Sequence, residues 1–307
     1  MTDGSDERRL GLLYGTSAYL LWGVFPLYFP LLEPAGTVEI LAQRMAWSLV
    51  TVVLVLRFGP GFAGVRAVLR NRAQFGLLAL AGVLIAVNWG TYIYGVNSGH
   101  VVESSLGYFI NPIFTILLGV AVLGERLRLA QWVAVGIGVI AVLVIAIDYG
   151  RPPWIALVLA FSFGLYGFCK KKADAAALDS LAVETAVQFV PALVAITVVG
   201  AQGNLVFGTR LPTSLLIAGT GVVTVIPLLM FAAGTRRLPL SVVGLLQFLT
   251  PVLQFAVGVG IRHEPLPTAE LVGFCLVWLA LIVLAVDGVR SQRSTNRAPV
   301  EESMALG

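Results

Sequence analysis

The amino-acid sequence predicts an all-α integral membrane protein whose ten transmembrane helices form two inverted five-helix repeats. Three observations predict this fold class: an apolar composition, ten apolar windows of spanning length and an internal repeat. Hydrophobic residues make up 58% of the 307 residues and charged residues only 12%, and the mean hydropathy is +0.91. Because soluble domains are about half apolar and a quarter charged, this composition excludes an ordinary soluble domain.

The first half of the chain holds five windows long enough to cross a bilayer, which takes about 20 helical residues. The windows cover residues 10–32, 38–58, 74–97, 101–123 and 130–147. The segments between them contain turn-forming or charged residues. Examples are Glu33-Pro34-Ala35-Gly36, the basic stretch from Arg57 to Arg72, and Gly124-Glu125-Arg126.

The second half repeats this arrangement with five further windows. They cover residues 154–170, 181–200, 213–233, 240–261 and 270–287. The separators are polar or rich in Gly and Pro: Asp148 to Pro152, Lys170-Lys171-Lys172, Gly203-Asn204, Arg236-Arg237, and Arg262 to Pro265. None of them is long enough to form a soluble domain.

The distribution of Lys and Arg orients the spans, because cytoplasmic loops carry an excess of both. With the N-terminus inside, 16 of the 20 basic residues fall on the cytoplasmic side, and only Arg151, Arg210 and Arg262 fall outside. We therefore expect both ends, residues 1–9 and 288–307, to be cytoplasmic tails. The charges are spread over many short loops, so the basic pI near 9.3 does not indicate a nucleic-acid partner.

An internal repeat relates the two halves. At an offset of 139 residues, Asn111-Pro112 matches Thr250-Pro251, and the same offset pairs Gly119 with Gly258, Glu125 with Glu264, Gly82 with Gly221 and Gly95 with Gly234. At an offset of 144 or 145, Trp22 matches Tyr166, Glu39 matches Glu184 and Gln43 matches Gln188. Each copy has an odd number of spans, so the second copy begins on the opposite side of the membrane and the two copies are inverted. Secondary transporters built in this way bind substrate between their halves. The first repeat is assigned to residues 10–148 and the second to 153–287.

Alternating access between two such halves needs hinges, and Pro112, Pro227 and Pro251 lie within apolar windows. The simpler explanation is that Pro is frequent in membrane helices. Pro112 and Pro251 occupy equivalent repeat positions, which favours a hinge role for these two.

Arg44 is the strongest candidate for substrate contact, because it lies about six residues, or roughly 9 Å, inside the second window. Three acidic residues are candidates for coupling or structural charges: Glu39 one turn from Arg44, Glu103 at the start of the fourth window, and Glu184 at the repeat equivalent of Glu39. The alternative is that Arg44 is a structural strut paired with Glu39 or Glu103.

A second group of candidates combines amides and aromatic rings, which suit an amphipathic organic solute better than a bare ion. Asn88 and Tyr92 share a helix face because they are four residues apart. The remaining members expected around the same cavity are Trp22, Trp89, Tyr108, Asn111, Tyr166, Gln188, Gln247 and Gln254. Helix–helix hydrogen bonding and interfacial aromatic belts are the alternative explanation.

Several functions lack their motifs. The chain has no nucleotide-binding Gly-x-x-x-x-Gly-Lys-Ser/Thr loop, no His-Glu-x-x-His and no Gly-x-Ser-x-Gly elbow. Without the nucleotide-binding loop we expect no direct use of ATP. Two cysteines and two histidines are too few for a zinc site, so we expect no metal, and no motif indicates a cofactor. A proton is the candidate coupling ion, and the Gly11/Gly15 and Gly95/Gly99 pairs permit close helix packing within a chain or in a homodimer.

Several motifs resemble those of the RarD-type permeases, EamA-domain members of the drug/metabolite transporter superfamily. They are Glu39-Ile40-Leu41 leading to Arg44, Asn88-Trp89, the run from Glu103 through Ser-Ser-Leu-Gly-Tyr-Phe-Ile to Asn111-Pro112, Leu123-Gly124-Glu125-Arg126, Tyr166-Gly167, Glu184-Thr185, and Val225-Ile226-Pro227-Leu228-Leu229. The similarity extends from about residue 10 to residue 290. One departure is Gln43, where the family usually has His, and it leaves proton coupling open.

The resemblance implies ten helices in two inverted EamA repeats, cytoplasmic termini and a bacterial inner-membrane location. The leading functional hypothesis is a non-enzymatic secondary transporter of a small organic metabolite or drug. Two alternatives stay open: a membrane-embedded enzyme acting on a lipid or isoprenoid substrate, and a non-transporting membrane accessory protein.

Overall fold

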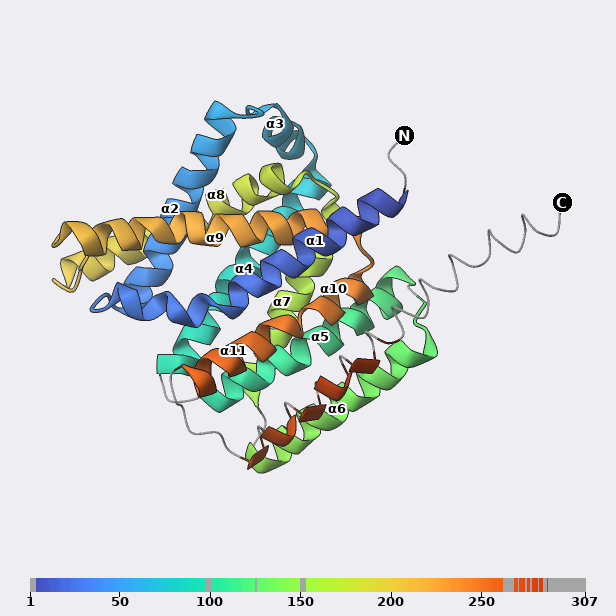
Figure 1. Ribbon diagram of the computed structural model, residues 1–307. Helices are drawn as coiled ribbons and strands as arrows, with labels where there is room; N and C mark the ends of the chain where they lie inside the picture. The colour runs from blue at the N-terminus through green and yellow to red at the C-terminus, as the bar shows by residue number, and fades with distance from the viewer. Residues whose placement is uncertain are drawn as a thin grey trace.

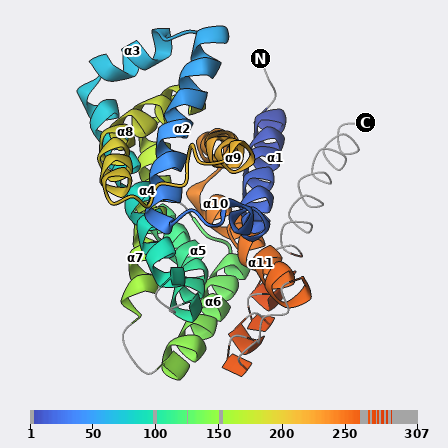
Figure 2. The ribbon, with the colours of Figure 1, turned by 90° about the vertical axis from the view of Figure 1, so that its left-hand side faces the viewer.

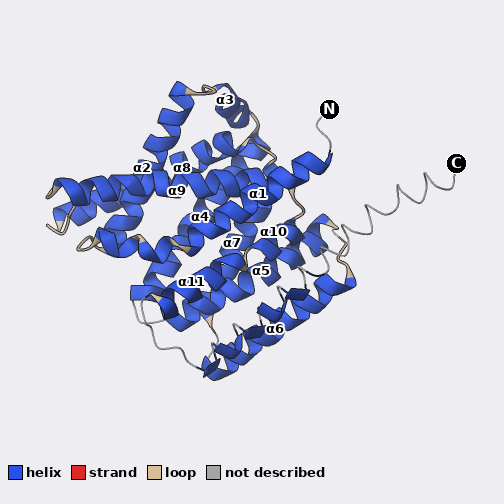
Figure 3. Ribbon diagram, viewed as in Figure 1, coloured by secondary structure: helices blue, strands red, loops and turns tan. Residues whose placement is uncertain are grey.

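The computed structural model describes residues 4–97, 101–124, 126–149 and 153–261, together with short stretches between residues 268 and 286. Within these residues every regular element is a helix and none is a strand (Figure 3). The helices pack side by side, with α6 at one edge of the bundle and α3 at the opposite edge (Figure 1).

Six α-helices and two short 3-10 helices form the first half of the chain. They are α1 (Gly4–Gly23), η1 (Phe25–Leu27), η2 (Phe29–Leu32), α2 (Thr37–Phe58), α3 (Ala63–Arg70), α4 (Arg72–Asn97), α5 (Val101–Leu123) and α6 (Leu129–Tyr149). The described part of the second half comprises α7 (Trp154–Ala173), α8 (Ala177–Ala201), α9 (Leu211–Arg237), α10 (Leu240–Leu246) and α11 (Leu249–Gly260).

Among the residues that the structure describes, five helical segments are long and apolar enough to cross a membrane. They are Thr37–Phe58, Arg72–Gly95, Trp154–Ala173, Ala177–Ala201 and Leu211–Arg237. Shorter apolar segments lie at Ile110–Leu123, Leu129–Val144, Leu240–Leu253 and Leu271–Ala280. The structure therefore shows an all-helical chain with several spanning helices, and the total of ten spans stays a prediction.

The expected helix over residues 10–32 is corrected at both ends. Helix α1 already begins at Gly4, where Glu7 pairs with Arg237 of α9 at an Oε2–Nε distance of 2.9 Å. It ends at Gly23, and the chain continues as η1 and η2. Pro26 and Pro30 lack the N–H that a continuing α-helix needs, which explains the change to short 3-10 turns.

Two further expectations about helix boundaries change. The window 240–261 divides into α10 and α11 at Gln247 and Phe248, and Pro251 lies in the first turn of α11, where a missing N–H costs little. The expected loop at Lys170-Lys171-Lys172 is instead the last turn of α7, which stops at Asp174 with a left-handed φ of 42°.

The contacts between the two halves are reciprocal (Figures 1 and 2). Helix α1 packs on α9 and α11, while α7 packs on α4 and α5. Helix α2 contacts α9, while α8 contacts α4. The α2–α8 and α5–α10 pairs complete the set, because each pairs two helices that hold the same place in their half.

Repeat-equivalent glycines lie at these contacts. A Cβ atom on Gly82 of α4 would lie 3.0 Å from the Glu184 carbonyl oxygen of α8, and one on Gly221 of α9 would press on the backbone of Trp47 in α2. A Cβ on Gly234 of α9 would lie 3.1 Å from the backbone nitrogen of Gly15 in α1. The α1 glycines therefore serve packing within the chain, and Gly99 lies outside the described residues.

Replacing Gly82 with Leu is expected to destabilise the protein by about 1–3 kcal/mol, because the side chain would push α4 away from α8. Gly76 of the same helix has open space around its Cβ direction, so Gly76→Leu is the matched control. Thermal unfolding of both purified variants in detergent measures the difference. Equal melting temperatures would contradict the close α4–α8 approach.

Candidate functional site

Arg44 lies in the interior of the bundle, and its side chain is enclosed by four elements. Arg44 is only 6% exposed. Its Nε donates a hydrogen bond to Thr224 Oγ1 of α9 at 2.6 Å. Its guanidinium carbon lies 3.9 Å from the centre of the Trp89 ring of α4, and the rings of Phe25 and Phe29 lie 5.7 and 5.9 Å away. Stacking on an aromatic face is a common arrangement for a desolvated guanidinium.

Glu39 is not a partner of Arg44, although it lies on the same helix. Its carboxylate accepts hydrogen bonds from the backbone N–H groups of Val206 (3.0 Å) and Phe207 (2.8 Å), in the loop between α8 and α9. The Phe207 ring packs on Trp47 of α2 at a centroid distance of 5.9 Å. Glu39 therefore ties this loop to the first turn of α2. Glu103 lies in the first turn of α5, but its side chain lies outside the described residues.

Tyr92 of α4 and Tyr108 of α5 extend the surroundings of Arg44. Their rings meet edge to face at a centroid distance of 5.6 Å, and Tyr108 lies in the neighbourhood of Arg44. Asn111 follows one turn after Tyr108 on α5 and is buried. Its Oδ1 has no hydrogen-bond donor among the described residues. The structure thus brings Arg44, Trp89, Tyr92 and Tyr108 together, with Asn111 one turn away along α5.

Three of the predicted amides bridge helices instead. Asn88 donates to the Leu159 carbonyl (2.9 Å) and to Ser162 Oγ (3.0 Å), both on α7. Gln188 of α8 donates to the Gly82 carbonyl of α4 at 2.8 Å. Gln247 at the α10–α11 break lies 3.3 Å from Thr115 Oγ1 of α5. The side chain of Gln254, another predicted amide, lies outside the described residues.

Trp22 and Tyr166 belong to an aromatic core between the halves. Trp22 of α1 packs edge to face on Phe163 of α7 at 5.7 Å and contacts Phe231 of α9 at 5.6 Å. Tyr166 of α7 stacks on the same Phe231 ring at 5.6 Å. Helices α1, α7 and α9 therefore meet around Phe231.

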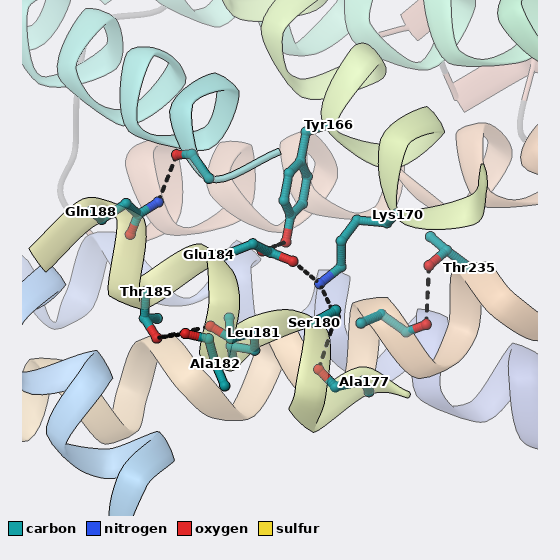
Figure 4. A network of polar contacts seen from close by, with 12 residues as sticks. Tyr166, Lys170, Ala177, Ser180, Leu181, Ala182, Glu184, Thr185, Gln188 and Thr235 are labelled. Atoms are coloured by element: carbon teal, nitrogen blue, oxygen red, sulfur yellow. Dashed lines mark hydrogen bonds and ion pairs between the residues drawn. The ribbon is translucent and has the colours of Figure 1, made fainter. Parts of the chain in front are cut away.

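Glu184 is the centre of a buried polar network between α7 and α8 (Figure 4). One carboxylate oxygen pairs with Lys170 Nζ at 2.5 Å, and the other accepts from the Tyr166 hydroxyl at 3.1 Å. Lys170 Nζ also donates to Ser180 Oγ at 2.7 Å. The side chains of Lys170 and Glu184 are 2% and 1% exposed, so this ion pair is shielded from water.

The three predicted hinge residues lie in different contexts. Pro112 lies inside the continuous helix α5, and its carbonyl is close to Gly244 of α10. Pro227 lies inside α9. Pro251 follows the break between α10 and α11, so this is the place where an interruption in the helix accompanies a predicted hinge.

Sequence reasoning missed four residues of these sites. Thr224, Phe25 and Phe29 surround Arg44, but a threonine or a phenylalanine in an apolar window carries no signal of its own. Lys170 was counted with a cytoplasmic charge run. Its distance of 14 residues from Glu184 could not reveal the pairing, because α7 and α8 lie antiparallel only after folding.

Comparison with known proteins agrees with this picture. The profile of the EamA-like transporter family matches residues 9–147. The protein RarD of Streptomyces exfoliatus is 54% identical over 297 residues, which cover 96% of this chain and 94% of the relative. An uncharacterized transporter of Pseudomonas aeruginosa is 41% identical over 287 residues, covering 93% of this chain and 96% of the relative.

A solved structure, titled as the crystal structure of a protein, superposes with a TM-score of 0.66 over 90% of this chain and 97% of its own. The identity is 16%, so the likeness concerns the fold alone. Together with the apolar helices, the relatives define a multi-pass membrane protein of transporter type. The chain belongs to the EamA-like transporter family, among the RarD-type permeases. This confirms the resemblance inferred from the motifs.

The buried ion pair between Lys170 and Glu184 is expected to stabilise the folded protein. Lys170→Met leaves the Glu184 carboxylate buried without its cation, so the unfolding free energy should fall by about 3–5 kcal/mol. The double variant Lys170→Met/Glu184→Met should recover part of this loss, because it removes both charges. Thermal or denaturant unfolding in detergent measures both.

Lys172 of the same helix is exposed, and Lys172→Met is the matched control, with an expected change below about 0.5 kcal/mol. If Lys170→Met and Lys172→Met unfold alike, the ion pair does not stabilise the α7–α8 contact.

Proposed function

We propose that this protein is a secondary transporter that moves a small organic solute across a bacterial inner membrane by alternating access. In this proposal ten helices form two inverted repeats, 10–148 and 153–287, and the solute binds between them. The observation that carries the proposal is the enclosure of Arg44 by helices of both halves, namely α2 and α4 from the first and α9 from the second.

The reciprocal contacts support the two-repeat arrangement. Helix α1 packs on α9 and α11 as α7 packs on α4 and α5, and α2 packs on α9 as α8 packs on α4. Such a pattern is expected when an axis in the membrane plane relates the halves. The equivalent close approaches at Gly82 and Gly221 follow the same symmetry.

A transporter fits the site better than the enzyme alternative. A hydrolytic or transfer reaction needs an acid or base beside the binding group. The Glu39 carboxylate is occupied by backbone N–H groups of the α8–α9 loop, and aromatic rings and a threonine surround Arg44. The family is likewise of transporter type, and the accessory-protein alternative is decided by a flux measurement.

The contacts favour structural roles for two of the acidic residues. Glu39 holds a loop and Glu184 holds Lys170, so each carboxylate already stabilises a helix-to-chain contact. Gln43, at the position of the family's His, accepts a hydrogen bond from Trp47 Nε1 at 3.1 Å. A Gln side chain cannot carry a proton in transport, so proton coupling in this chain would use a different residue.

Replacing Arg44 with Ala should reduce solute flux in proteoliposomes to the background of empty vesicles, because it removes the central binding charge. The solute is first identified by screening amino acids, nucleosides, cofactors and phenicols for uptake by the wild-type protein. Arg57→Ala is the control, since Arg57 lies at the exposed end of the same helix. Undiminished flux in Arg44→Ala protein would contradict the assignment, and a full screen without any flux would contradict transport itself.

The expected orientation, with both termini in the cytoplasm, predicts which loops are accessible from outside the cell. In a background with Cys169 and Cys275 replaced by Ser, a cysteine at Arg210 should react with an impermeant thiol reagent added to intact cells. A cysteine at Arg70 should react only after the cells are opened. Both positions are exposed in the structure, so a reversed pattern would mean that the termini face outward.

A further inference from the structure

We infer that the solute is an organic anion with a flat, unsaturated body, and that its charged group binds the Arg44 guanidinium. This inference rests on the proposed function and deepens it by naming the substrate class. It follows from three features of the site: the hydrogen-bonding edge of Arg44, the absence of a described negative charge beside it, and the rings around it.

The guanidinium of Arg44 is fixed at one nitrogen and over one face. Thr224 accepts from Nε, and the Trp89 ring covers the face at 3.9 Å. Among the described residues, nothing accepts a hydrogen bond from Nη1 or Nη2. The two terminal nitrogens form a planar fork that matches a carboxylate or a phosphate in two parallel hydrogen bonds. The described residues thus hold the fork in one orientation without occupying it.

The charge of Arg44 also lacks a described counter-charge. Its described neighbours, Thr224, Trp89, Phe25, Phe29 and Tyr108, are neutral side chains. The nearest carboxylate on its own helix, Glu39, binds the loop instead. A cation inside a membrane bundle is costly without an anion. A bound solute anion would supply that charge.

The remaining groups indicate the body of the solute. Trp89, Tyr92, Tyr108, Phe25 and Phe29 present aromatic surface, on which a flat unsaturated group stacks well. Asn111 adds a buried Oδ1 without a described donor, one turn along α5 from Tyr108. Buried acceptors are usually satisfied, so an O–H or N–H group of the solute is the expected partner. An unsaturated hydroxy acid combines these features.

The test compares acids with neutral analogues of the same shape. The probe pairs are benzoate with benzamide and 4-hydroxycinnamate with 4-hydroxycinnamamide, and phenyl phosphate distinguishes a phosphate from a carboxylate. Binding to the full-length protein in nanodiscs is measured by quenching of tryptophan fluorescence, since Trp89 lies on the guanidinium. The variants are Arg44→Gln and Arg44→Lys, with Arg57→Gln as the control on the same helix.

The wild-type protein and the Arg57→Gln control should bind an acid at least about tenfold more tightly than its amide. Arg44→Gln should lose this preference while still binding the amide, and Arg44→Lys should keep it with weaker binding of the acid. A wild-type protein that binds acid and amide equally, or binds neither in any pair, would overturn the inference. That comparison needs no variant, so misfolding of Arg44→Gln leaves it intact.

Flux separates this inference from the proposed function. If acids bind as expected and no solute crosses proteoliposomes, the anion site stands and transport fails. A neutral solute could instead be transported by the wild-type protein and not by the Arg44→Ala protein, with no competition from acids. In that case transport stands and the inference of an anionic substrate fails.

Discussion

Every polar group inside this bundle has to find its partner within the protein, because lipid offers no hydrogen bonds. That constraint explains how the described polar side chains are used. Asn88 joins α4 to α7, Gln188 joins α8 to α4, and Lys170 with Glu184 joins α7 to α8. The first two contacts link helices distant in the sequence, and the third links consecutive helices. The same hydrogen bonds that satisfy the polar groups therefore also hold the helices in place, and close packing at Gly82 brings α4 near enough to α8 for the Gln188 bond.

Arg44 is the buried charge that this rule leaves incomplete. Its Nε is satisfied by Thr224 and its face by Trp89, while the terminal fork has no described acceptor. A group that the fold positions firmly but does not neutralise is suited to a ligand that arrives and leaves. Lys170 shows the contrast, since its ammonium is paired with Glu184 and bonded to Ser180. Of the two buried cations among the described residues, Lys170 is paired within the fold, and Arg44 is the better candidate for function.

Glu39 and Glu184 show how repeat-equivalent residues can differ in use. Glu39 accepts backbone N–H groups of Val206 and Phe207, whereas Glu184 accepts a lysine and a tyrosine. The Glu39 bonds join α2 to the α8–α9 loop in the other half of the chain, whereas the Glu184 bonds join α8 to the preceding helix α7. The same sequence position in the two halves is therefore used for different contacts: a loop is held by one carboxylate and a lysine of the adjacent helix by the other.

The sequence by itself determined the helical membrane class, most of the long helices and the family, and it singled out Arg44 as a candidate, because hydropathy, charge and motifs are local properties of the chain. It misjudged the breaks at Gly23 and Gln247 and the extent of α7, since a Pro or Lys signal does not say whether a helix bends, stops or buries the residue. Only the tertiary structure decided that Thr224, Phe25 and Phe29 surround Arg44 and that Lys170 pairs with Glu184. Thr224 comes from a helix in the other half of the chain, whereas Phe25 and Phe29 come from the short helices before α2. Lys170 and Glu184 lie on two consecutive helices. Their meeting depends on packing, which no local pattern records.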